Sequence, residues 1–301
     1  MSTPRKIVYF PDVCLEDLDA GVLVAYPRSE AHGHRYYAVP SFLIIGAAKS
    51  GTRELLKWLN EHPDLNPSHK EVNFFDEVID IEKEWIRYVL TPHNQVSKKA
   101  THAEVCTSQT FEKSPEYMWR RNNGVPVPAL VRQMMPNGKF IVILRNPTDR
   151  AYSAYQMRRR GTKLNPAKGD LGSFEDFIFR DGMFTESRTC VQAGHYAEHL
   201  KVWLEYFSRD QLLVLFSDEF RDTPFQMMEK TLRFLGVPKL DYRPLATRAE
   251  RGFWVLRGHG SKAFEPAYAP MSPNMRARLD EHYAPWNQRL KEMFPTLNFP
   301  W

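Results

Sequence analysis

The chain has few cysteines and no long hydrophobic segment. Its 301 residues include three cysteines, Cys14, Cys106 and Cys190, which are far apart and form no C-x-x-C pair. This spacing supports neither a disulfide framework nor a zinc site, so we expect no metal. The strongest apolar run, Phe42 to Ala48, is too short to cross a membrane, and no apolar stretch follows the N-terminus. We therefore expect a reducing, cytoplasmic setting and no membrane partner.

The chain also lacks charged tails and low-complexity segments. Charged residues make up 26% of the sequence, with both signs interspersed and a formal net charge of +5. Together with 43% hydrophobic residues, this composition excludes a disordered protein and allows a substantial core. The one dense basic run, Arg158–Arg160, fits a solvated helix end, or else a contact with an anionic acceptor or nucleic acid. Because the other basic residues are spread along the chain, we expect no nucleic-acid partner.

Short apolar runs alternate with amphipathic segments along most of the chain. Three runs are typical of buried parallel strands: Ser41–Ile45, Lys139–Leu144 and Gln211–Phe216. Four segments have helical patterns: Arg53–Glu61, Pro147 to about Arg159 after the N-cap Asn146, Pro224–Leu235 closed by Gly236, and a helix from Ser272-Pro273 that breaks at Pro285 and resumes to Phe294. This alternation predicts an α/β domain with a central parallel sheet flanked by helices.

We find no internal repeat and no linker in the sequence. Residues 1–40 are rich in turn-forming and aromatic residues, and we expect them to form an N-terminal lead-in packed on the domain. Residues 41–301 then form a single domain. In such folds, ligands bind at the carboxyl ends of the parallel strands, so we expect the functional residues there.

The turn after the first strand has a phosphate-binding pattern. Gly46-x-x-Lys49-Ser50-Gly51-Thr52 joins a strand to a helix, so that backbone N–H groups and the positive helix end face one point. The kinase P-loop reads G-x-x-x-x-G-K-[ST], and here Thr52 stands where that lysine should be. Without it, the loop suits a single phosphate, with Lys49 placed over a leaving-group oxygen. The alternative is a purely structural turn.

A carboxylate and an amide follow the first helix, in the segment 70–75, which reads KEVNFF. Glu71 stands among aromatic residues, where burying a carboxylate is costly unless it reacts or is paired. A carboxylate with a raised pKa can take a proton from a hydroxyl or an amine, so Glu71 is our candidate base. The alternative is an ion pair with a nearby lysine or arginine. If the segment is extended, Asn73 shares the face of Glu71 and, with Phe75, is a candidate acceptor contact.

Two further segments supply cations. In EKSPEY, residues 112–117, the proline makes Ser114 extended or turned, so Lys113 lies at the entry of a new segment and could neutralise charge on a leaving phosphate. An exposed loop lysine is the alternative. Arg145 ends a buried strand and Ser153 lies about two turns into the next helix, an arrangement that suits one phosphate. The alternative for Arg145 is a salt bridge that caps the sheet.

These four segments, in this order, resemble the sulfotransferase family that uses 3′-phosphoadenosine-5′-phosphosulfate (PAPS). The likeness is greatest to the heparan sulfate sulfotransferases, whose motifs read G-x-x-K-x-G-T, E-x-[HQ]-F-F, E-K-[ST]-P-x-Y and R-[DN]-P-x-x-R-A-x-S. Two later segments also match this branch: residues 192–200 resemble its Q-x-G-x-Y-x-x-H-L, and residues 283–287 resemble its Y-x-P-[FW]-N. The resemblance runs from about residue 40 to the end of the chain.

The resemblance implies a role for each matching residue. The 5′-phosphosulfate would be held by Lys49, Ser50, Gly51, Thr52 and Arg53. The 3′-phosphate would be held by Arg145 and Ser153, and by a late loop that includes Arg257, Ser261 and Lys262. Glu71 would be the base, with Lys49 and Lys113 beside the sulfuryl group. No metal is needed, because the cations are side chains.

The sequence also departs from the branch that it resembles. Asn73 stands where that branch has His or Gln, and no cysteine follows Cys190 to make the carboxyl-side disulfide of the Golgi members. We therefore expect a cytoplasmic enzyme that transfers a sulfuryl group from PAPS to a hydroxyl or amine of a small polar metabolite or saccharide, and releases 3′-phosphoadenosine-5′-phosphate (PAP). The alternatives are a P-loop phosphotransferase and a non-enzymatic module that binds nucleotides or polyanions.

Overall fold

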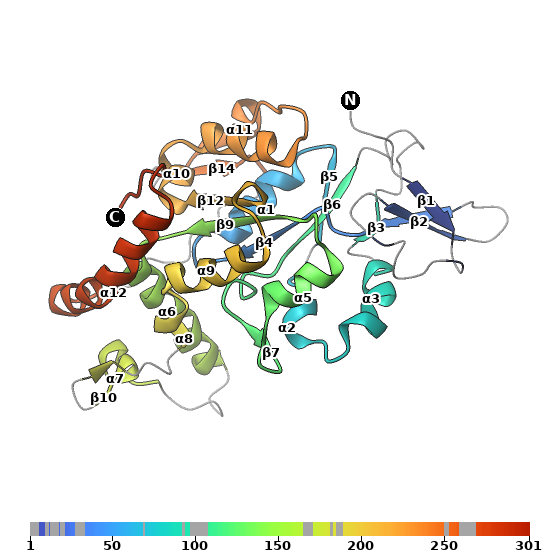
Figure 1. Ribbon diagram of the computed structural model, residues 1–301. Coiled ribbons are helices and arrows are strands. Elements are labelled where there is room, and N and C mark those ends of the chain that lie inside the picture. The colour runs from blue at the N-terminus through green and yellow to red at the C-terminus, as the bar shows by residue number, and fades with distance from the viewer. Residues whose placement is uncertain are drawn as a thin grey trace.

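The computed structural model describes most of the chain, and the described residues are 6–9, 12, 18, 22–27, 34–68, 70–91, 94–96, 108–164, 171–180, 183–184, 189–249, 253–258 and 269–301. At the centre lies a parallel sheet of five strands in the order β12-β9-β4-β6-β5 (Figure 1). Its strands are β4 (Phe42–Gly46), β5 (Leu65–Pro67), β6 (Gln109–Lys113), β9 (Lys139–Leu144) and β12 (Leu212–Phe216). The structure therefore confirms the α/β fold with a central parallel sheet.

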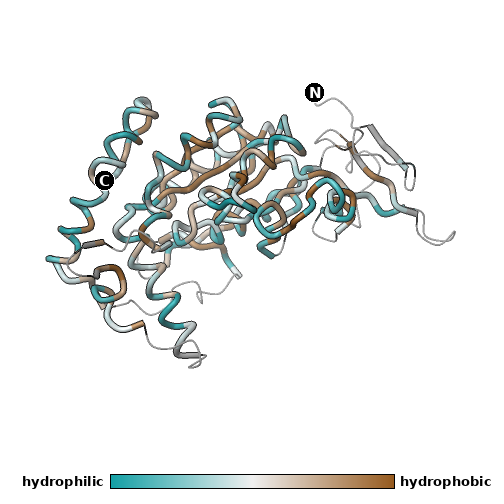
Figure 2. Tube along the Cα trace, turned by 60° about the horizontal axis from the view of Figure 1, so that its bottom comes forward, coloured by the Kyte–Doolittle hydropathy of each residue, from teal (hydrophilic) through white to brown (hydrophobic). Residues whose placement is uncertain are grey.

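Helices cover both faces of this sheet, because its strands are apolar on both sides. In β4, Leu43 and Ile45 join one buried cluster, whereas Phe42 and Ile44 join another. The first cluster packs on α5 (Val127–Met134) and α9 (Tyr196–Tyr206), and the second on α1 (Thr52–Asn60) and α11 (Pro224–Leu235). In Figure 2 the central strands are brown, and the helices around them mix brown with teal.

The remaining elements lie around this core. In the described part of the chain, the other helices are α2 (Phe74–Glu77), α3 (Ile81–Val89), α6 (Pro147–Leu164), α7 (Phe174–Ile178), α8 (Thr189–Gln192), α10 (Ser217–Asp222), α12 (Pro273–Met293) and the 3₁₀ helices η4 (Arg209–Gln211) and η5 (Arg243–Leu245). Two-stranded sheets pair β7 (Arg121–Asn122) with β8 (Val125–Pro126), β10 (Phe179–Arg180) with β11 (Met183–Phe184), and β13 (Ala246–Arg248) with β14 (Trp254–Leu256). In the described part of the chain, no helix is both long and apolar enough to cross a bilayer.

The N-terminal lead-in contains a small sheet that the sequence analysis did not predict. It consists of β1 (Lys6–Tyr9), β2 (Val22–Pro27) and β3 (His34–Ala38), with β1 parallel and β3 antiparallel to β2. Val24 and Tyr37 from this sheet are buried in the same cluster as Leu43 of the central sheet. The described parts of residues 1–40 thus share the core of the α/β domain.

Two helices differ from their predicted bounds by more than one residue at an end or in their continuity. Helix α6 extends to Leu164 rather than about Arg159. Helix α12 is continuous from Pro273 to Met293, so the predicted break at Pro285 is wrong. A proline inside a helix removes one backbone hydrogen bond, and here Tyr283 and Leu290 on either side of it are buried and hold the helix together by packing. The predicted caps are confirmed, because Asn146 Oδ1 accepts from the Thr148 N–H at 3.0 Å and Gly236 has a φ of 75°.

Candidate active site

The β4–α1 turn forms an open cradle of backbone N–H groups. Lys49 and Gly51 have φ angles of 71° and 103°, which turn the chain sharply before α1 begins at Thr52. In the described part of the chain, the N–H groups of Gly51, Thr52 and Arg53 have no protein acceptor. These groups lie at the positive end of α1, where an anion would satisfy them. The cradle therefore fits a phosphate.

The polar side chains of the turn differ in exposure. Ser50 and Thr52 are buried, whereas Arg53 is exposed. With the other described residues, the Ser50 hydroxyl makes no hydrogen bond of ordinary geometry. It nevertheless lies close to the hydroxyl of Tyr196: burial raises the pKa of Tyr196, and Arg150 and the Ser50 hydroxyl oppose that rise. A buried hydroxyl with unused hydrogen-bonding capacity, directly beside the cradle, is a further feature that fits a phosphate oxygen.

The next strand, β9, brings Arg145 beside the cradle. Its Nη1 atom lies 3.5 Å from the carbonyl oxygen of Lys49, and its own carbonyl accepts from the Tyr196 hydroxyl at 2.9 Å. Among the described residues Arg145 makes no salt bridge, so the alternative of an ion pair capping the sheet is wrong. Ser153, on α6, is 9% exposed. Arg145 is therefore held at the sheet edge by backbone contacts, and its charge has no carboxylate partner there.

The neighbouring strand on the other side, β6, ends at Lys113. The side chain of Lys113 is only 6% exposed, and its Nζ donates a hydrogen bond to Oε1 of Glu71. The alternative of an exposed loop lysine is therefore wrong. The ion-pair alternative for Glu71 is confirmed, but its partner is the other candidate catalytic residue. Glu71 is itself 44% exposed, so the expectation that its carboxylate is buried among aromatic residues is wrong.

The segment after Glu71 is not extended. Asn73 has a φ of 54° in the left-handed region and precedes the short helix α2, so the expectation that it shares a strand face with Glu71 is wrong. Its N–H donates to Ser114 Oγ at 3.1 Å. Phe75 has no exposed surface, and its ring packs against Trp85 and Tyr117. Phe75 is therefore part of the buried aromatic packing beneath the segment 71–75.

Two carboxyl groups that the sequence analysis missed lie near this segment. Burial raises the pKa of Glu112 to about 7, although the hydroxyls of Tyr117, Tyr88 and Ser114 oppose the rise. Burial likewise raises the pKa of Asp76 to about 6, against the opposing charge of Arg120. In the sequence, the signal for Glu112 is its position directly before Lys113 on one strand. Because consecutive strand residues point to opposite faces of a sheet, Glu112 faces away from the side chain of Lys113.

The late loop is described only in part. Arg257 follows β14, and its Nε donates to the carbonyl of Ala246 at 3.2 Å. Ser261 and Lys262 lie outside the described residues, so the predicted third component of the 3′-phosphate site stays a prediction. Across the described ranges, no three His, Cys, Asp or Glu residues are grouped closely enough to hold a metal ion.

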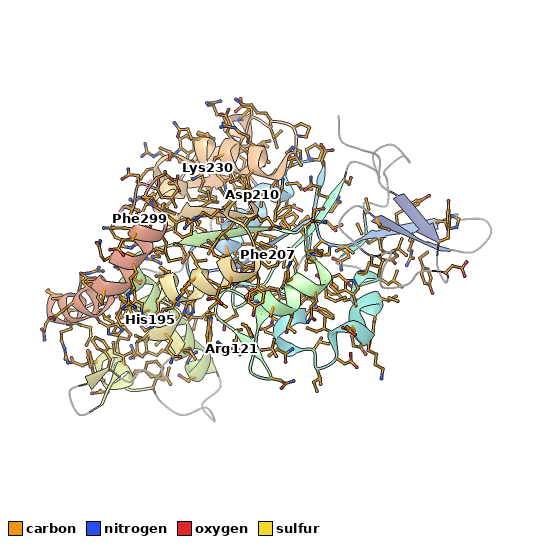
Figure 3. All side chains as sticks on the ribbon, in the orientation of Figure 1. Arg121, His195, Phe207, Asp210, Lys230 and Phe299 are labelled. Carbon is orange, nitrogen blue, oxygen red and sulfur yellow. The ribbon has the colours of Figure 1, made fainter. Side chains whose placement is uncertain are left out.

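The two later motifs meet behind the cradle, where α9 begins beside α12. His195, labelled in Figure 3, stacks on Trp286 with ring centroids 4.1 Å apart and lies 3.0 Å from His282 between the Nε2 atoms. Burial and, to a smaller extent, the neighbouring His282 lower the pKa of His195 to about 4, so His195 is neutral near pH 7. At Gly194 an added Cβ would lie 2.8 Å from the Tyr283 ring. These motifs therefore pack the helix that carries Tyr196.

The family of the chain follows from comparison with known proteins. The sulfotransferase domain family matches residues 40–256, well over half of the chain. The chain belongs to the sulfotransferase family. PAPS is the sulfuryl donor of this family and PAP is its product. The match includes the cradle and the residues Glu71, Lys113 and Arg145.

Several sulfotransferases are similar along most of this chain. Mouse bifunctional heparan sulfate N-deacetylase/N-sulfotransferase 4 is 32% identical, with 87% of this chain and 30% of that protein covered. Human heparan sulfate glucosamine 3-O-sulfotransferase 6 is 30% identical, with 89% of this chain and 75% of that protein covered. The chain thus spans less than a third of the length of the bifunctional relative. The crystal structure of a sulfotransferase from Alicyclobacillus acidocaldarius shares the fold, with a TM-score of 0.56, 24% identity, and 87% of this chain and 98% of that chain covered.

Proposed function

We propose that this sulfotransferase moves a sulfuryl group from PAPS to a hydroxyl or amine of a saccharide or small polar metabolite, with Glu71 as the base. The observation that carries the proposal is the contact between Glu71 and Lys113 at the end of β6, the strand next to the β4–α1 cradle. A proton acceptor and a cation then lie together at the edge of the sheet where a phosphate would be held.

PAPS supplies an activated sulfuryl group, bonded to its 5′-phosphate. The N–H groups of the cradle, with Ser50 and Thr52, would bind that phosphate, and Arg145 and Ser153 would bind the 3′-phosphate. Glu71 takes the proton of the acceptor as the acceptor oxygen or nitrogen forms its bond to sulfur. The bond from sulfur to the phosphate oxygen breaks in line, and the electron pair leaves with PAP. Lys49 and Lys113 stabilise the charge that grows on this oxygen.

The exposure of Glu71 favours this assignment. A base must reach the proton that it removes, and a side chain that is 44% exposed is accessible to an acceptor, whereas the buried Glu112 is not. The relatives named above include both N- and 3-O-sulfotransferases of heparan sulfate. Because one carboxylate can serve either chemistry, we include a saccharide amine and a saccharide hydroxyl among the acceptors to be tested.

Replacing Glu71 tests the proposal. Glu71→Gln keeps the shape of the side chain but removes its ability to take a proton, so turnover should fall by roughly 10²- to 10⁴-fold. Binding of PAP, measured by calorimetry, should change little because Glu71 does not belong to the cradle. The assay uses radiolabelled PAPS with unsulfated polysaccharide and with fractionated small metabolites. Near-normal turnover of the variant would remove Glu71 as the base.

The phosphotransferase alternative is tested by the choice of nucleotide. Thr52 occupies the position where a P-loop lysine would reach the terminal phosphates of ATP. We therefore expect PAP to raise the thermal unfolding temperature more than ATP does at equal concentration. A larger shift with ATP and magnesium would favour a kinase instead.

A further inference from the structure

A second carboxyl group lies directly beneath the segment that carries Glu71. Glu112, the neighbour of Lys113 on β6, has no exposed surface. Its Oε2 accepts from the Tyr88 hydroxyl at 2.8 Å, whereas its Oε1 has no partner of ordinary hydrogen-bonding geometry among the residues that the structure describes. The hydroxyls of Tyr117 and Ser114 nevertheless lie close enough to oppose the rise in pKa that burial causes. Three hydroxyl groups therefore surround one buried carboxyl.

Two of these hydroxyls also hold the backbone of the segment 71–75. The N–H of Asn73 donates to Ser114 Oγ at 3.1 Å, and the N–H of Phe75 donates to the Tyr117 hydroxyl at 3.2 Å. A hydroxyl that accepts a backbone N–H still has its own proton to donate. The unfilled Oε1 of Glu112 is an acceptor close to both hydroxyls. Each hydroxyl can therefore link Glu112 to the backbone on either side of Phe74.

Packing around this carboxyl leaves few alternatives for those hydroxyl protons. The Tyr88 ring stacks on Phe74 at 4.3 Å and on Trp85 at 5.1 Å between centroids, and the Tyr117 ring lies 5.7 Å from that of Phe75. In such an apolar enclosure, the orientation of a hydroxyl is set by the acceptors that lie nearby. The Glu112 carboxyl interacts with both hydroxyls, and it has no exposed surface through which water could replace it, while Asp76 is a second carboxyl close to Glu112.

We propose that Glu112 is a positioning residue, which orients the hydroxyls of Ser114 and Tyr117 and through them fixes the segment that carries Glu71. The inference rests on the proposed role of Glu71 as the base. Loss of Glu112 should lower kcat, because the segment that carries Glu71 would no longer be fixed. It should leave the binding of PAP unchanged, because Glu112 does not touch the cradle. Glu112 lies on the same strand as Lys113, whose Nζ donates to the Glu71 carboxylate in the ion pair. One strand end would thus supply both partners that place the base.

Amide exchange and kinetics of Glu112→Gln test this inference together. At pH 8 the Glu112 carboxyl, whose pKa burial raises to about 7, offers two acceptor oxygens, whereas glutamine offers one. We expect hydrogen exchange at the Asn73 and Phe75 amides to accelerate by roughly tenfold. We also expect kcat to fall by roughly 10- to 100-fold, with the dissociation constant of PAP unchanged. Glu84→Gln, on the exposed face of α3, is the matched control and should alter none of these.

The outcomes separate the inference from the proposed function. If wild-type protein transfers sulfuryl and Glu112→Gln keeps normal kcat and exchange, the positioning role is wrong and the function stands. If wild-type protein transfers none, the exchange rates at Asn73 and Phe75 still decide whether Glu112 fixes the segment. Should Glu112→Gln not fold, Ser114→Ala and Tyr117→Phe test the same links, and normal exchange and kcat in both would overturn the inference. In the folded variant, adding Tyr117→Phe should lower kcat little further, because both changes break one chain of contacts.

Discussion

The buried Glu112 carboxyl should make the stability of this sulfotransferase depend on pH in an unusual direction. Burial raises its pKa from 4.5 to about 7, so the folded protein holds a proton that the unfolded chain has already lost. Its contribution to the free energy of unfolding is therefore fully present below pH 4.5 and is lost as the pH rises through about 7. At about 1.4 kcal/mol for each pH unit, the loss amounts to about 3 kcal/mol.

Glu112→Gln isolates this contribution, because glutamine does not titrate. Asp76, whose pKa is raised to about 6, and His195, whose pKa is lowered to about 4, also make stability depend on pH, but both are present in wild type and variant. Urea unfolding at half-unit steps from pH 4.5 to 8 gives the free energy of unfolding of each protein. The difference between the two curves should move by about 3 kcal/mol in favour of the variant as pH rises. Parallel curves would refute the assignment of a raised pKa to Glu112.

Three further predictions concern packing, charge and metal. Gly194→Ala should lower the free energy of unfolding by about 1–3 kcal/mol, because the new Cβ would overlap the Tyr283 ring. The control Gly161→Ala has open space around it in α6 and should not be destabilising. Equal thermal unfolding temperatures of the two variants would contradict this prediction. Lys113→Met should lower kcat by roughly 10²-fold or more, and normal turnover would remove Lys113 from the mechanism. A chelator should leave sulfuryl transfer unchanged in a radiolabel assay, since strong inhibition would indicate a required metal.

The local patterns of the sequence were sufficient for one central strand and for two helix ends. The apolar strand β9 has the predicted bounds, and Asn146 and Gly236 act as the predicted helix caps. These features depend on neighbours within a few residues: strand hydrophobicity, the side-chain oxygen of an N-cap, and the freedom of glycine to adopt a positive φ. The order of the four motifs likewise predicted the family, because each motif follows its own strand or helix.

Contacts between distant segments were decided only by the tertiary structure. The sheet order places β4 between β9 and β6, which brings Arg145 and Lys113 to either side of the cradle. It also determines which carboxylate is exposed: Glu71 reaches Lys113 from a loop, whereas Glu112 turns inward among Tyr88, Tyr117 and Ser114. Strand order and burial depend on packing across the whole chain. The sequence by itself was therefore sufficient to name the candidate residues, while only the fold separated the accessible Glu71 carboxylate from the buried Glu112 carboxyl.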